Sequence, residues 1–215
     1  MSEPRPLVVK VGGGLLRDEG LDGLRRACAD VSEIATRRPV LVVPGGGPFA
    51  DAVRAIDEQV GLSDHDAHIL AMRAMDQLGV LLAPMLPGAE SLTDLVAPRG
   101  LGVLEVARAF AGRAGVPESW AVTSDSLAVL AAGAIGADEA ILLKPVAGVV
   151  ATWPSDDPPL PELTDQQLRA LQGAGAGLAV DPYLPEAVRR TGVRVTIRRP
   201  GTSALSGTRI TRNPD

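Results

Sequence analysis

The stretch Lys-Val-Gly-Gly-Gly at Lys10–Gly14 decides how this chain folds. It closes a short apolar run, Leu7–Val11, that is typical of a buried strand, and the glycines favour a tight turn into a helix. Without Cβ atoms, the backbone N–H groups of such a turn can approach phosphate oxygens, and the following helix adds its positive end. The pattern therefore indicates either a plain turn between strand and helix or a phosphate-binding loop.

A second loop of the same kind, Pro-Gly-Gly-Gly-Pro at Pro44–Pro48, follows the apolar run Val40–Val43. Three glycines held between prolines can form an anion or carbonyl site lined by backbone. Apolar strands alternating with helices predict a mainly parallel sheet covered on both faces, in which ligands bind at the carboxyl ends of the strands. The expected fold class is α/β, a three-layer αβα sandwich, in a single domain over residues 1–215.

The rest of the chain continues this alternation, with one stretch, Pro84–Pro117, that predicts only weak strands and loops. Trp153–Pro161 is expected to be an irregular loop because it is rich in proline. Further helices are expected at Leu21–Arg38, Phe49–Val60, Asp64–Ala83 (capped by Ser63 or Asp64), Thr123 to about Ile135, Thr164–Gln172 and Pro182–Thr191, and further strands at Glu139–Leu143, Val193–Arg198 and Thr208–Thr211.

The composition limits the function classes. The chain has 215 residues, a net charge of −5 and five aromatic residues, which argues against general nucleic-acid binding. The one cysteine, Cys28, excludes an internal disulfide and a zinc site built on cysteines. No apolar run reaches the length of a membrane span, and the first residues do not resemble a signal peptide, so a cytoplasmic protein is expected.

Two lysines stand out among 21 cationic residues, since all the others are arginines. Lys10 precedes the first glycine loop, and Lys144 leaves the buried strand at 139–143 into a loop containing proline and glycine. On the helix at 64–83, His68 and Asp76 share one face. That face is either a wall of an acceptor site, with His68 donating to a phosphate and Asp76 pairing a substrate amine, or a solvated or interface face.

Taken in order, five pieces of the chain resemble the amino-acid kinase family. The resemblance implies an αβα sandwich with the phosphoryl acceptor over residues 1 to about 120 and ATP, with Mg²⁺, over about 121 to 215. The pieces are KVGGG at Lys10–Gly14, PGGGP at Pro44–Pro48, TSDS at Thr123–Ser126, ILLKPVAGV at Ile141–Val149 and GTRI at Gly207–Ile210.

The resemblance also implies roles for single residues, none of them as a metal ligand. The expected catalytic residues are Lys10, Asp125 and Lys144. Lys10 would bridge the donor and acceptor phosphoryl groups, and Asp125 would orient it. Relatives that act on acetylglutamate carry a late lysine that is absent here from Asp181–Pro185, so Lys144 is expected to replace it at the nucleotide phosphates. The nucleotide is expected at Lys10, Gly12, Gly13, Lys144, Gly148, Asp181, Gly207 and Thr208, and the acceptor at Gly45, Gly46, Gly47, His68, Asp76, Thr123 and Ser124.

Within the family, Ala71–Gln77 and Trp120–Ser126 resemble the small branch that acts on aminomethylfuranmethanol phosphate in methanofuran biosynthesis. The expected activity is transfer of the ATP γ-phosphoryl group to a small anionic acceptor by a homo-oligomeric enzyme. Other acceptors stay open: UMP, isopentenyl phosphate, acetylglutamate or carbamate. So does a non-catalytic ligand- or oxometalate-storing protein of this fold, whereas a dinucleotide-dependent oxidoreductase fits poorly because the GxGxxG pattern is missing.

Overall fold

The computed structural model describes residues 4–152, 155–174, 179–203 and 206–214. Within these residues, eight strands form one sheet in the order β3-β4-β2-β1-β5-β7-β8-β6. The strands are β1 (Leu7–Val11), β2 (Val40–Pro44), β3 (Glu90–Leu92), β4 (Leu101–Leu104), β5 (Glu139–Leu143), β6 (Glu162–Thr164), β7 (Arg194–Arg198) and β8 (Thr208–Thr211).

The sheet is mainly parallel. Neighbouring strands pair in parallel everywhere except between β7 and β8, so β8 and β6 run against the other six. The carboxyl ends of β1, β2 and β5 therefore meet at one edge, and both glycine loops lie there. The expected α/β fold class with a mainly parallel sheet is confirmed.

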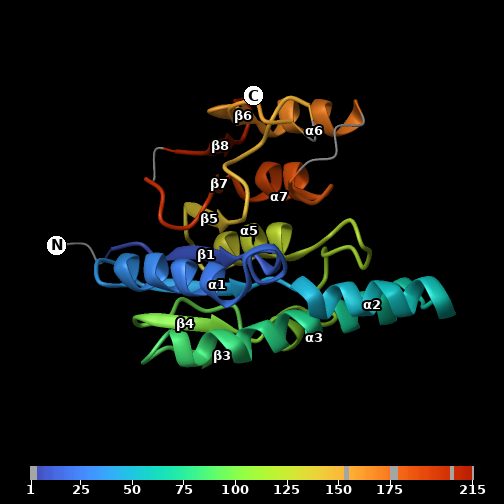
Figure 1. Ribbon diagram of the computed structural model, residues 1–215, viewed down its shortest axis with the longest axis horizontal. Coiled ribbons are helices and arrows are strands. Elements are labelled where there is room, and N and C mark those ends of the chain that lie inside the picture. The colour runs from blue at the N-terminus through green and yellow to red at the C-terminus, as the bar shows by residue number, and fades with distance from the viewer. Residues whose placement is uncertain (1–3, 153–154, 175–178, 204–205, 215) are drawn as a thin grey trace.

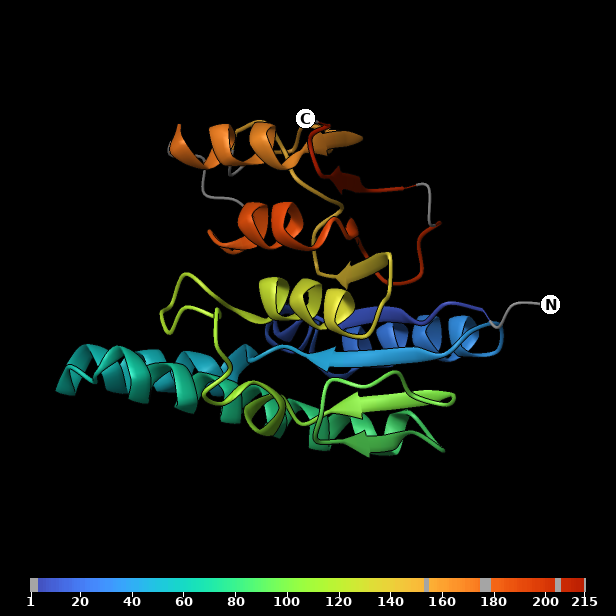
Figure 2. The ribbon, with the colours of Figure 1, turned by 180° about the vertical axis from the view of Figure 1, so that it is seen from behind.

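Helices cover both faces of the sheet, and the pleat of β1 shows how. Val9 packs with Leu24 of α1 on one face, while Val8 packs with Leu127 of α5 on the other. Figure 1 shows α1 in front of β1, and Figure 2, from behind, shows α5, α6 and α7 in a row. The helices are α1 (Gly13–Ala35), α2 (Gly47–Val60), α3 (Asp64–Leu82), α4 (Val106–Phe110), α5 (Ser124–Ala134), α6 (Asp165–Gly173) and α7 (Leu184–Thr191), with a 3-10 turn at Ala83–Met85.

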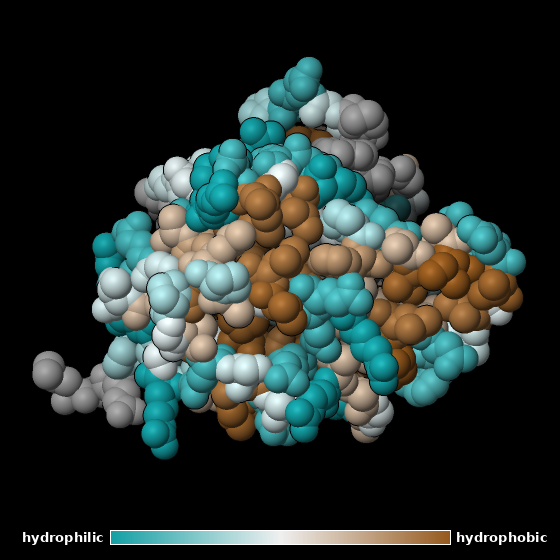
Figure 3. Space-filling model, turned by 60° about the horizontal axis from the view of Figure 1, so that its bottom comes forward, coloured by the Kyte–Doolittle hydropathy of each residue, from teal (hydrophilic) through white to brown (hydrophobic). Residues whose placement is uncertain are grey.

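Helices α2 and α3 lie side by side and extend beyond the sheet (Figure 1). The hydroxyl of Ser63 accepts the Asp66 N–H at 3.1 Å and so caps α3, as expected. Ile56 and Val60 of α2 and Val80 of α3 are exposed, and Figure 3 shows apolar side chains among polar ones on this side of the molecule. Among the described residues, no helix is both long and apolar enough to cross a membrane.

The structure differs from the sequence-based expectation in three places. Helix α1 begins at Gly13 rather than Leu21, because it consists of two helical segments joined at Gly20, whose φ of 62° few other residues adopt. The segment 84–117 holds two short strands, β3 and β4, as expected, but also helix α4, and strand β6 was not expected. Trp153 and Pro154 of the expected proline-rich loop lie outside the described residues.

The sheet continues across both expected halves of the chain. Strands β3, β4, β2 and β1 belong to the first half and β5, β7, β8 and β6 to the second, with β1 and β5 paired at the junction. This continuity supports the single domain that we propose for residues 1–215, and it brings Lys10 and Lys144 to the same place.

Candidate active site

The two glycine loops lie against each other, backbone to backbone. The Gly45 N–H donates to the Val11 carbonyl at 2.9 Å. A Cβ on Gly13 would lie 2.0 Å from the Gly47 nitrogen, and a Cβ on Gly45 would lie 2.4 Å from the Gly13 nitrogen. Only glycine allows this approach, which places the N-terminal ends of α1 and α2 side by side at one edge of the sheet.

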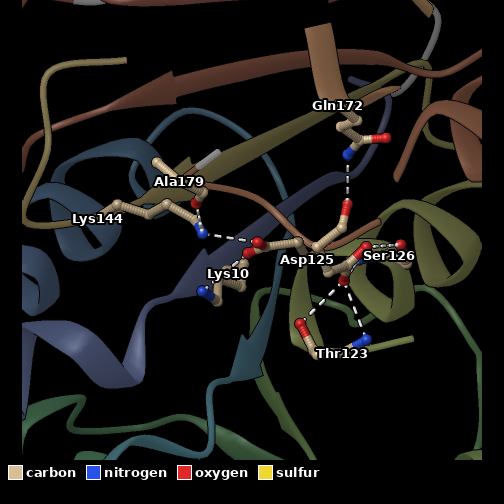
Figure 4. Close-up of polar contacts among 8 residues, drawn as sticks. Lys10, Thr123, Asp125, Ser126, Lys144, Gln172 and Ala179 are labelled. Carbon is tan, nitrogen blue, oxygen red and sulfur yellow. Dashed lines mark hydrogen bonds and ion pairs between the residues drawn. The ribbon is translucent and has the colours of Figure 1, made fainter. Parts of the chain in front are cut away.

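Two buried lysines share one carboxylate at this edge (Figure 4). The pleat of β1 turns Lys10 toward α5, Asp125 lies in the first turn of α5, and Lys144 follows β5 directly. The Asp125 Oδ1 lies 2.9 Å from the Lys10 Nζ, and its Oδ2 lies 2.6 Å from the Lys144 Nζ. Lys144 also donates to the Ala179 carbonyl. The structure thus brings together the three residues expected to be catalytic.

The electrostatics of this cluster suit an anionic ligand. Burial lowers the pKa of Lys10 to about 8, although the Asp125 carboxylate opposes the shift. Burial alone would raise the pKa of Asp125, but the two ammonium groups outweigh it and hold this pKa below its usual value. The side chains of Lys10, Lys144 and Asp125 are 5%, 12% and 3% exposed, so two ammonium groups share one carboxylate in a largely buried place beside the glycine loops.

Asp181 lies behind this cluster and holds the start of α5. Its Oδ2 accepts the Thr123 N–H at 3.0 Å, the Thr123 hydroxyl at 2.9 Å and the Ser126 N–H at 2.9 Å, and its Oδ1 accepts the Ser126 hydroxyl. The Gln172 side chain donates to its carbonyl at 3.0 Å (Figure 4). Burial and Asp125 raise the pKa of Asp181. With these partners Asp181 holds the residues on either side of Asp125, and it lies on the wall of neither cavity described below, so its contact with the nucleotide stays a prediction.

A cavity of about 240 Å³ opens above the two lysines. It lies between the N-terminal ends of α1 and α2, the start of α3 and the loop before α5. Gly45 packs behind the wall, against Gly13. Of the expected site residues, those on the wall are Lys10, Gly12, Gly13, Gly46, Gly47, His68, Thr123, Ser124, Asp125 and Lys144.

The two histidines of α3 have different surroundings. His68 is buried on the cavity wall, where burial lowers its pKa despite a hydrogen bond with the Ser119 backbone. His65 is exposed, and its Nδ1 lies 2.9 Å from the Glu118 carboxylate, which raises its pKa. His68 therefore faces the space expected for an acceptor, whereas His65 binds the loop that precedes Trp120.

Asp76 is not on this wall. Its Oδ1 accepts the Val106 N–H at 2.5 Å, and its Oδ2 accepts the Ala107 N–H at 3.3 Å, so it caps α4. Two helical turns separate it from His68, about 12 Å along the axis, and the cavity covers only the nearer part of that face. The structure therefore does not bring Asp76 to this cavity, and its pairing with a substrate amine stays a prediction.

The cavity wall includes charged residues that sequence reasoning missed. Arg17, Asp51 and Arg54 lie on it, together with Trp120, which belongs to a resembling motif but had no assigned role. Arg17 lies one helical turn after Gly13, and Asp51 lies one helical turn after Gly47, where Gly13 and Gly47 are the glycines that touch each other. That spacing is a signal that could have identified them.

A second cavity, of about 520 Å³, adjoins the first, since Val146 lines both. Gly148 lies on its wall. Thr208 lies behind the wall and accepts the Val149 N–H at 2.8 Å through its hydroxyl. Gly207 also lies behind it, with a φ of 117°, and a Cβ there would meet the Ile197 carbonyl at 2.1 Å. These two residues shape the loop after β5 rather than line the cavity.

Metal-binding side chains do not gather in the part of the chain that the structure describes: no three His, Cys, Asp or Glu residues lie together there as a metal site. Both oxygens of Asp125 face lysines. A Mg²⁺ ion commonly keeps several waters and binds substrate phosphates, so it could arrive with a nucleotide.

Fold and site together define an α/β protein with two adjoining cavities at the carboxyl ends of parallel strands. The sequence matches the amino acid kinase family over residues 5–91 and 89–199. The chain belongs to this family, which confirms the resemblance stated above.

Among curated proteins it is similar to [5-(aminomethyl)furan-3-yl]methyl phosphate kinase from Methanocaldococcus jannaschii. The two are 28% identical over 152 residues, which is 68% of this chain and 69% of that protein. The resemblance to this branch of the family therefore rests on more than the two short motifs.

Solved structures show the same fold. Uridylate kinase from Archaeoglobus fulgidus superposes with a TM-score of 0.73 at 23% identity, covering 95% of this chain and 99% of that one. Carbamate kinase from Giardia lamblia, bound to AMP-PNP, superposes with a TM-score of 0.65 at 15% identity, covering 99% and 100%. The expected three-layer arrangement is thus the fold of known kinases.

Proposed function

We propose that this protein is a kinase that transfers the γ-phosphoryl group of ATP to the phosphate of a small acceptor. An oxygen of the acceptor phosphate attacks the γ-phosphorus, the bond to the β-phosphate oxygen breaks, and ADP leaves. A phosphate dianion has no proton to lose, so no general base is required. Such transfer depends mainly on positioning and on neutralising charge.

One observation carries the proposal: Lys10 and Lys144 meet on Asp125 at the wall of the first cavity, which shares Val146 with the second. A donor phosphate reaching in from the second cavity and an acceptor phosphate in the first would face each other across these ammonium groups. Backbone N–H groups of the glycine loops and the ends of α1 and α2 add positive potential. The similarity in fold to a kinase bound to AMP-PNP supports ATP as the donor.

For the acceptor we propose aminomethylfuranmethanol phosphate. The similarity to the Methanocaldococcus protein, which is named for this substrate, supports the choice. The acceptor cavity of about 240 Å³ is small compared with the roughly 300–1,000 Å³ that drug-sized ligands occupy, which favours a small acceptor over a nucleotide such as UMP. Mg²⁺ and a homo-oligomeric state stay predictions, and light scattering tests the second.

A coupled assay of ADP release tests this function. The panel contains aminomethylfuranmethanol phosphate, UMP, isopentenyl phosphate, acetylglutamate and carbamate, each with ATP and Mg²⁺. We expect the highest kcat/KM with the furan phosphate. A higher value with another phosphate contradicts the acceptor but not the kinase, and ADP release with none contradicts the kinase.

The pKa of Lys10 predicts how activity depends on pH. Because burial lowers this pKa to about 8, raising the pH above 8 removes the ammonium charge from the free enzyme. We expect kcat/KM for the acceptor to fall about tenfold per pH unit above about pH 8. In Lys10→Arg the guanidinium keeps its charge, so the residual activity of this variant should lack the fall. A wild-type profile that stays flat to pH 9.5 contradicts the role of Lys10.

Lys144→Met is expected to raise the KM for ATP more than the KM for the acceptor. Lys144 follows β5 on the wall of the first cavity, two residues before Val146, which lines both cavities. Loss of a charge-assisted hydrogen bond to a phosphate corresponds to roughly a 10- to 100-fold change. Initial rates with each substrate varied in turn measure this, with Lys144→Arg as the control that keeps the charge. If the KM for the acceptor rose more than the KM for ATP, the acceptor would belong in the second cavity and ATP in the first.

A further inference from the structure

Three charged side chains form a cluster at the mouth of the acceptor cavity. Arg17 Nη1 lies 3.0 Å from Asp51 Oδ2, and Arg54 Nη1 lies 3.2 Å from Asp51 Oδ1. All three residues lie on the cavity wall, and their side chains are 53%, 36% and 45% exposed in the order Arg17, Asp51, Arg54. The two guanidinium groups share the Asp51 carboxylate, and all three side chains line the same cavity as the glycine loops.

Other contacts hold each arginine in place. Arg17 also contacts Asp18, with its Nε 3.3 Å from Oδ1. The Arg54 guanidinium lies 4.6 Å from the centre of the Trp120 ring, and the Trp120 indole N–H donates to Asp57 at 2.8 Å. Arginines fixed in this way lose little side-chain freedom when a ligand binds.

Both arginines keep donors to spare. A guanidinium has five N–H donors, and the described contacts use two on Arg17 and one on Arg54. Arg17 also lies close to the first glycine loop, since a Cβ on Gly14 would be 3.4 Å from its Nη2. An anion resting on the N-terminal ends of α1 and α2 would therefore have unused guanidinium donors beside it.

We propose that Arg17 and Arg54, oriented by Asp51, bind the phosphate that the acceptor already carries and so select phosphorylated acceptors over carboxylates. This rests on the proposed function. A phosphate monoester has a charge of about −1.5 to −2 at pH 7 and three terminal oxygens, whereas a carboxylate has one charge and two oxygens. Two guanidinium groups and the backbone N–H groups of the loops match the larger anion. Asp51 is a positioning residue here and does not touch the substrate.

Steady-state kinetics of Arg17→Gln and Arg54→Gln test the proposal, with the acceptor and ATP varied separately. Each variant is expected to raise the acceptor KM roughly 10- to 100-fold and to change the KM for ATP little. Arg17→Lys and Arg54→Lys keep the charge but lose the planar fork, and should give intermediate values. The matched control is Arg25→Gln: Arg25 is an exposed α1 arginine paired with Asp22 at 2.6 Å and lies on neither cavity wall. It should behave as wild type.

The outcomes separate this inference from the choice of acceptor. If another phosphate is the best acceptor in the panel, the same variants are measured with that phosphate, and the same loss supports the inference. A larger rise in the KM for ATP, or no rise in either constant, overturns it. A wild-type enzyme that prefers acetylglutamate or carbamate overturns both claims. Calorimetric binding of the acceptor without ATP gives a second readout, and weakening by the glutamine variants but not by Arg25→Gln supports the inference.

Discussion

Lys10→Met is expected to lower kcat by about 10²- to 10³-fold while the protein still folds. The Lys10 ammonium is a fixed charge on the wall of the first cavity, and loss of one preorganised donor to a developing charge typically costs roughly 3–4 kcal/mol. Folding should survive because Asp125 keeps its 2.6 Å ion pair with Lys144, so that no buried charge is left alone. Single-turnover rates at saturating ATP and acceptor measure the effect.

A near-normal turnover of Lys10→Met, with a normal unfolding temperature, would show that Lys10 does not act on the transferred group. Lys10→Arg is the matched control. It keeps the charge in a larger, planar group, and its rate should lie between those of the methionine variant and the wild type.

Asp125→Asn is expected to reduce both stability and activity. The substitution keeps the shape of the side chain but leaves two ammonium groups buried side by side without a counter-charge. Removal of one partner from a buried ion pair typically costs about 3–5 kcal/mol of unfolding free energy. Urea denaturation measures the loss, and kinetics on the folded fraction should show a large fall in kcat because both lysines lose their orientation.

Asp22→Asn is the control for this experiment, because it removes an exposed ion pair from α1, with Arg25, and should change stability little. If Asp125→Asn were as stable as Asp22→Asn, the two lysines would not depend on Asp125 for their burial. Loss of stability with unchanged kcat would make Asp125 purely structural.

Much of the fold could be predicted because its signals are local. Strands β1 and β5 have the expected bounds, since runs of aliphatic residues between turn residues are typical of buried strands. Strand β8 also has them, and its buried residues alternate with more exposed ones. The start of α1 was misplaced because a glycine-rich turn can also be the first turn of a helix. Gly20, with its positive φ, joins the two helical segments of α1, and the sequence pattern therefore predicted only the second segment.

The site could be predicted only in part, for a physical reason. Lys10 and Lys144 are two lysines among many arginines, and strand order alone brings them to adjoining strands. The helical spacing of His68 and Asp76 predicts that they share a face of α3, but it does not predict what packs on that face. Helix α4 packs against the Asp76 end, and α4 is a short helix in a segment whose sequence carries only weak signals. The contact between Arg17 and Asp51 joins two helices, so no spacing along either one reveals it.

Asp181 shows a related limit of prediction from sequence. Asp181 was expected at the nucleotide because it follows the family pattern, yet its hydrogen bonds hold Thr123 and Ser126 in place beneath Asp125. A motif gives the residue type and the approximate place. Whether a side chain faces the ligand or the residue behind it depends on packing that the linear sequence does not contain.

Phosphorus-31 NMR of the complete reaction tests the central claim most directly, because it identifies the bond that forms. The wild-type enzyme is incubated with ATP, Mg²⁺ and aminomethylfuranmethanol phosphate, with Lys10→Met as the inactive control. We expect the acceptor phosphate signal to be replaced by two mutually coupled doublets of a diphosphate ester, in step with ADP. ADP accompanied only by inorganic phosphate, with the acceptor signal unchanged, would contradict the account.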